Sequence, residues 1–123
     1  MPNRNTKPKD AAVATRDPGH DHDELISTFS QLWASKYWEG LLELESEMNA
    51  IAPSLENKDS LGAGRIYHHL GDAHRDLGRQ GGMLQAIVYF QKLLELAKKA
   101  GNESHQCLVA SILSECYMKM DRV

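Results

Sequence analysis

Four closely spaced residues carry the side chains best suited to chemistry: His68, His69, Asp72 and His74. On a helix, His68 and Asp72 would share a face because they lie four positions apart. Imidazole and carboxylate groups bind metals and transfer protons near neutral pH. A metal or acid–base site would need a third ligand from another helix, and the sequence offers no clear one. A metal-dependent hydrolase using these histidines and aspartates is therefore the third-ranked hypothesis.

A second cluster, His20-Asp21-His22-Asp23, could also coordinate a metal. It lies beside Gly19 in a stretch expected to be flexible, where ordering the chain costs most entropy. An acidic segment before a helix is the better interpretation, because carboxylates favour the positive end of a helix. The chain contains no HExxH, CxxC, P-loop or GxSxG motif. We therefore expect no enzyme activity, no catalytic residue, no metal and no cofactor.

Length and charge are typical of one small domain. The 123 residues are 41% hydrophobic and carry a formal net charge of −3, which gives no reason to expect nucleic acid or an anionic membrane as partner. Four basic and two acidic side chains give residues 1–18 a net charge of +2, so the rest of the chain carries −5. Residues 1–22 are rich in Pro, Asn, Lys and Asp, and we expect a disordered basic tail there.

The two cysteines, Cys107 and Cys116, lie on one expected helix. Nine residues of helix separate them by about 13 Å along the axis, whereas a disulfide requires Cα atoms within about 7 Å. Reduced thiols are typical of the cytosol and nucleus. No signal peptide and no membrane-spanning apolar stretch is visible. We expect a cytoplasmic protein, with the nucleus as the alternative.

Apolar residues recur at helical spacing, and no run alternates as a strand would. The spacing predicts helices at residues 23–35, 37–52, 61–77, 83–100 and 103–120. Pro53 should end the second helix, Asp59 or Ser60 should cap the third, and Gly78 should end it with a left-handed residue. Short connections make consecutive helices antiparallel. The prediction is one all-α domain over 23–123, with hairpins at 23–53 and 61–100 and a final helix at 103–120.

The hairpins also behave as copies of one unit. Leu70 would correspond to Leu113, and Gly40 to Ala86, at separations of 43 and 46 residues. A period in this range indicates a unit that cannot bury its apolar face alone and must stack on its neighbours.

The central copy resembles the tetratricopeptide repeat, whose signature places aromatic, Leu-Gly and Ala positions at fixed offsets in a helical hairpin. The resemblance is clear over about residues 63–120 and weak over 23–53. Its structural positions are Tyr67, Leu70, Gly71, His74, Gly78, Ala86, Phe90 and Leu93. Seven residues separate Gly78 from Ala86, so the turn should be about three residues longer than usual, which is similar to the longer-repeat type. The resemblance implies about five helices stacked as a short right-handed solenoid.

The same resemblance implies a function in protein binding. In tetratricopeptide arrays the first helix of each hairpin lines a groove that holds a partner peptide or helix, as in adaptors and scaffolds. The matching exposed positions carry both signs of charge; they are Arg65, His68, His69, Asp72, Arg75 and Asp76. The second hypothesis is a structural bundle that self-assembles through residues 103–120, where apolar residues leave only a narrow polar stripe. Another protein, or a second copy of the chain, is thus the expected partner.

Overall fold

The computed structural model describes residues 18–121, which form six helices and no strand. The helices are α2 (Pro18–Ala34), α3 (Trp38–Leu42), α4 (Glu45–Leu55), α5 (Ser60–Leu77), α6 (Gly82–Lys99) and α7 (Glu103–Asp121). The all-α class is confirmed, although the number of helices exceeds the expected five by one. Of the tail expected at residues 1–22, residues 1–17 lie outside the described residues.

The first helix begins earlier than predicted, at Pro18 instead of residue 23. Proline suits the first turn of a helix, because the amide hydrogen that it lacks would have no intrahelical partner there. The helical segment therefore includes residues 18–22, which the sequence analysis assigned to the tail. A turn at residues 35–37 follows α2. In this turn Lys36 has a φ angle of 60°, and the Tyr37 amide donates to the Leu32 carbonyl over 3.0 Å.

The single helix predicted for residues 37–52 is wrong, because α3 and α4 are separate. At the joint, the Leu44 amide donates to the Leu41 carbonyl over 3.0 Å, a tighter spacing than in an α-helix. Both helices pack against α5. Pro53 also fails to end α4, which continues to Leu55. Its ring removes one backbone hydrogen bond, but only two helical residues follow it.

The α5–α6 hairpin follows the expected local rules. The Asp59 side chain caps α5 by accepting from the Gly62 amide over 3.0 Å. Gly78 and Gly81 have φ angles of 73° and 77°, which favour glycine. The turn spans only residues 78–81, because α6 begins at Gly82. A Cβ atom on Gly82 would lie 2.8 Å from the His74 carbonyl oxygen, so the close approach of α6 to the end of α5 requires glycine there.

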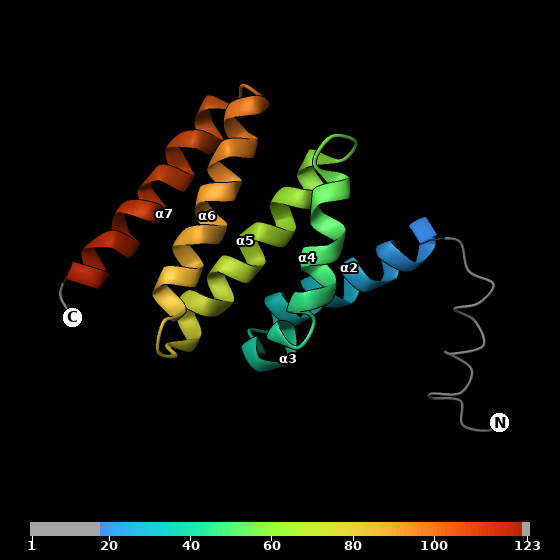
Figure 1. Ribbon diagram of the computed structural model, residues 1–123, viewed down its shortest axis with the longest axis horizontal. Coiled ribbons are helices and arrows are strands. Elements are labelled where there is room, and N and C mark those ends of the chain that lie inside the picture. The colour runs from blue at the N-terminus through green and yellow to red at the C-terminus, as the bar shows by residue number, and fades with distance from the viewer. Residues whose placement is uncertain (1–17, 122–123) are drawn as a thin grey trace.

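From one end of the molecule, α7, α6 and α5 lie side by side, and α4, α2 and the short α3 lie on the other side of α5 (Figure 1). The most extensive packing is between α5 and α6, followed by α6 with α7, while α2 approaches α3 and α5 more closely than α4. Side chains from all six helices contribute to one continuous core. Its largest fully buried members are Tyr67, Phe29, Phe90, Leu41, Met48, Ile66 and Leu70.

Small residues lie where α5 and α6 pack against each other. A Cβ atom on Gly71 would lie 2.7 Å from two atoms of the Phe90 ring, which is fully buried. Ala86, one turn before Phe90, is also fully buried. These two small residues let the helix backbones come close, and the Phe90 ring fills the space beside them.

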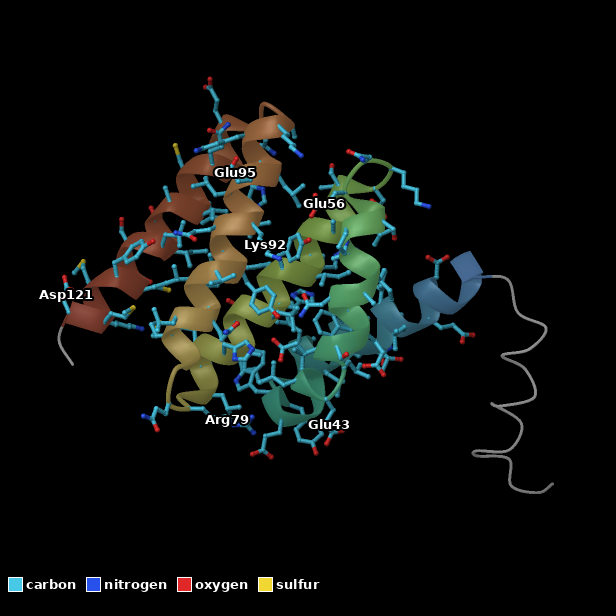
Figure 2. The ribbon with its side chains drawn as sticks, viewed as in Figure 1. Glu43, Glu56, Arg79, Lys92, Glu95 and Asp121 are labelled. Carbon is cyan, nitrogen blue, oxygen red and sulfur yellow. The ribbon has the colours of Figure 1, made fainter. Side chains whose placement is uncertain are left out.

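A polar network joins α4 to this hairpin. Glu45 Oε2 accepts from His74 Nε2 over 2.8 Å and from the Tyr89 hydroxyl over 2.5 Å. The hydrogen bond from His74, and then the one from Tyr89, hold the pKa of Glu45 below its usual value although burial acts to raise it. Nearby, the Tyr67 hydroxyl donates to Glu56 over 2.6 Å. Figure 2 labels Glu56 together with Lys92 of α6, whose ammonium lies 5.4 Å from the Tyr67 ring centroid.

Candidate functional site

A cleft of about 550 Å³ opens where four helices meet. Its walls come from residues 30–34 of α2, 60–69 of α5, 93–100 at the end of α6 and 102–105 at the start of α7. Because these segments are far apart in sequence, only the packing of the helices brings them together. The volume lies within the range of about 300–1,000 Å³ typical of ligand pockets.

Apolar side chains form much of the lining. Leu93, Leu96 and Ala97 contribute from α6, where each is at least nine-tenths buried. On the α5 side, Leu61 is 77% exposed and also lines the cleft. An exposed leucine beside buried apolar residues is the kind of surface that a partner's apolar side chain can cover.

An aromatic stack from α2 and α5 forms another wall. The Trp33 and His69 rings are stacked with centroids 4.3 Å apart and an interplanar angle of 14°. The Trp33 indole donates from Nε1 to Asp72 Oδ2 over 2.8 Å. Trp33 is therefore held on one side by the His69 ring and at its edge by a carboxylate, which fixes its orientation in the cleft.

His69 is neutral in this environment. Its side chain is 4% exposed, and its Nε2 lies 3.4 Å from the Ser30 hydroxyl oxygen. Burial, followed by the charges of His68 and Arg65, lowers the pKa of His69 to about 3. Its Nδ1 is buried with no hydrogen-bond partner among the described residues. A proton on His69 would therefore be both poorly solvated and repelled by its neighbours.

The structure divides the six predicted groove residues into two groups. Arg65, His68 and His69 line the cleft, whereas Asp72, Arg75 and Asp76 do not. The expectation that His69 and Asp72 are exposed is wrong, since they are 4% and 7% exposed. The rings of α2 cover this part of α5, so these two polar side chains find their contacts within the protein.

Asp72 is at the centre of the second group. Besides Trp33, it accepts from Arg75 Nη2 over 2.9 Å, and His68 Nε2 lies 3.6 Å from it. Arg75 also donates to Asp76 over 3.1 Å, and its guanidinium lies 5.7 Å from the Phe90 ring centroid. The carboxylate of Asp72 is thus used to hold α2 and α5 together and is turned away from the cleft.

Arg65 is the exposed charge that remains at the cleft. Among the described residues its guanidinium takes part in no ion pair, and no residue that lines the cleft carries a carboxylate. His68 and His105 add two further imidazoles to the lining. The sequence predicted both acidic and basic side chains in the groove, but the described lining of the cleft contains no acidic side chain.

Several residues that line the cleft were not predicted from the sequence as site residues. Trp33 was predicted only as part of an apolar stripe, and His105 was not singled out. A weak signal existed for Leu61, which is apolar but lies off the buried stripe of its helix. For Trp33 and His105 the sequence carries no such signal, because their place at the cleft depends on how α2 and α7 pack.

Within the part of the chain that the structure describes, no three His, Cys, Asp or Glu residues are grouped to hold a metal. The side chains of His20, Asp21 and His22 lie outside the described set. Cys107 is exposed, Cys116 is buried, and both are free. None of the described helices combines the length and apolar character needed to cross a bilayer.

Comparisons with protein-family models, with curated proteins and with solved structures found no match for this chain.

Proposed function

We propose that this protein is an interaction module that holds a short peptide or helix of a partner protein in the cleft between α2, α5, α6 and α7. The observation that carries the proposal is the cleft itself, with an apolar lining and an ordered tryptophan at its wall. Rigid aromatic side chains beside apolar pockets are typical of the positions that dominate protein–protein binding energy.

The tetratricopeptide-like reading supports this proposal. The helices α5, α6 and α7 follow one another in chain order (Figure 1), and Gly71 lies against Phe90, as the resemblance implies. The first helices of the expected repeats, α2, α5 and α7, all contribute to the cleft. We propose that the chain is a short stack of this type and serves as an adaptor.

The test is selection of binding peptides from a random dodecapeptide display library against the full chain. Peptides that bind are then titrated against two variants with the same substitution at exposed alanines. Ala34→Trp places a large ring at the cleft, because Ala34 lines it. Ala50→Trp places the same ring on α4, at a position that does not line the cleft. We expect affinity to fall at least tenfold in the first variant only, with both variants retaining the helical circular-dichroism spectrum.

Two results would contradict the proposal. One is a library that yields no enriched peptide. The other is peptides that bind both tryptophan variants as tightly as the natural chain, which would place binding elsewhere.

A second candidate function is self-assembly through α7. Three large apolar side chains of this helix are half exposed: Leu108 at 56%, Met118 at 52% and Tyr117 at 46%. Val109, Leu113 and Cys116 of the same helix are buried where it packs on α6, and the Tyr117 hydroxyl accepts from Gln91 of α6 over 2.8 Å. A helix with apolar residues on both sides favours a further packing partner.

A further inference from the structure

The lining of the cleft differs in charge from the rest of the protein. The whole chain has a net charge of −3, yet no described residue that lines the cleft is acidic, while Arg65, His68, His69 and His105 all line it. Asp72, which lies one turn after His68 on α5, is not part of this lining because its carboxylate is bonded to Trp33 and Arg75.

We propose that the partner segment held in this cleft is acidic, with at least one carboxylate that pairs with Arg65 and an apolar side chain that packs between Trp33 and Leu96. This inference rests on the proposed function, because it specifies the peptide that the module binds. Arg65 is the anchor since its guanidinium is exposed and makes no ion pair with any described residue. An arginine without a carboxylate partner can accept one in a two-point hydrogen-bonded pair.

The positions of the other cleft residues support the same arrangement. Trp33 presents an aromatic ring whose edge nitrogen already donates to Asp72, so its remaining surface is suited to apolar contact. His69 contributes no charge in the folded protein, because burial and then the charges of His68 and Arg65 lower its pKa. Among the described residues, the cleft thus combines the exposed Arg65, which has no carboxylate partner, with an apolar lining.

Two other occupants fit this chemistry less well. Residues 1–18 of the same chain carry a net charge of +2, so Arg65 would repel them. A second copy of the chain would have to present an acidic apolar segment to the cleft, and the exposed apolar surface of α7 does not require Arg65. Charge complementarity therefore favours a segment of a different, acidic protein.

The peptide selection described above also tests this inference, with a charge reversal added. We expect the peptides enriched on the natural full-length chain to contain more Asp and Glu than the starting library. Replacing their acids by Asn and Gln, or introducing Arg65→Glu into the protein, should lower affinity about tenfold or more, as expected for loss of a charge-assisted pair. The matched control is Lys119→Glu, an exposed position near the other end of α7, which should leave affinity within twofold.

A complementary swap completes the test. Peptides with their acids changed to Lys should bind Arg65→Glu better than they bind the natural chain. Enrichment of neutral or basic peptides, still blocked by Ala34→Trp, would overturn the acidic partner while leaving the proposed function standing. A library that yields no peptide would instead remove the proposed function. A synthetic peptide of residues 1–17 that competed with the selected peptides, or self-association abolished by Arg65→Glu, would identify the chain itself as the occupant and overturn the inference.

Discussion

At the scale of single residues, the contacts of Trp33 decide what the cleft can bind. Its indole nitrogen donates a hydrogen bond to the Asp72 carboxylate, and its ring stacks on the ring of His69. Arg75 then binds the same carboxylate from the next turn of α5. One acid and one histidine are thereby removed from the exposed set, and Arg65 is left without an acidic neighbour in the cleft.

The burial of His69 predicts a dependence of stability on pH. Its pKa is lowered from 6.5 to about 3 on folding, so between these values the unfolded chain binds a proton that the folded protein does not. Burial of the neutral His69 side chain therefore costs no stability above pH 6.5, and the free energy of unfolding decreases as the pH falls from 6.5 towards 3. The free energy of unfolding should drop by about 1.4 kcal/mol per pH unit below 6.5 from this residue.

Urea unfolding between pH 7.5 and 5 measures this slope. The variant His69→Phe keeps an aromatic ring against Trp33 but cannot titrate, so it should lose that share of the slope. The measurement stops at pH 5, because the carboxyl group of Glu45, whose pKa is lowered from 4.5, contributes to the pH dependence of stability only below that pH. Equal slopes in the natural chain and the variant would show that His69 is not responsible.

At the scale of helices, the sequence predicted the second half of the chain well. The bounds of α5, α6 and α7 lie within one residue of those expected. Local chemistry sets these ends: the Asp59 cap of α5 and the left-handed Gly78 and Gly101 after α5 and α6. The break between α3 and α4 could not be predicted in this way, because no proline or glycine lies at the joint.

The close approach of α5 and α6 gives a prediction at this scale. Gly71→Ala should lower the free energy of unfolding by about 1 kcal/mol, because overpacking against the buried Phe90 ring outweighs the better helix propensity of alanine. Gly64→Ala on the same helix is the control. Its Cβ would lie 3.2 Å from Leu93 Cδ1, a side-chain end that can shift, so stability should stay the same or rise by up to about 1 kcal/mol.

Chemical denaturation followed by circular dichroism compares the two variants with the natural chain. If Gly71→Ala were as stable as Gly64→Ala, the contact between Gly71 and Phe90 would not limit the packing of the hairpin.

At the scale of the whole molecule, α7 is the last helix of the row and has a neighbour on one side only within the described structure (Figure 1). The exposed apolar residues of α7 predict concentration-dependent self-association. Replacing Leu108 and Met118 together by Glu should shift the protein towards the monomer, since charges in an apolar interface are costly to bury.

Sedimentation velocity over a hundredfold range of concentration tests this prediction, with Ala50→Glu as an exposed control on α4. A natural chain that remains monomeric throughout would contradict self-assembly as a function, and it would leave the peptide-binding proposal unaffected.

The sequence by itself determined the helices of the hairpin and the small residues that let them approach, because helical periodicity, caps and glycine turns act over a few neighbouring residues. Arg65 and His68, which the sequence predicted on an exposed face of α5, both line the cleft. Only the tertiary structure decided the charge of the cleft. The contact between Trp33 and Asp72 joins residues 39 positions apart, and no local pattern encodes it. That contact turns a face with both signs of charge into a cleft lined by cationic, imidazole and apolar groups.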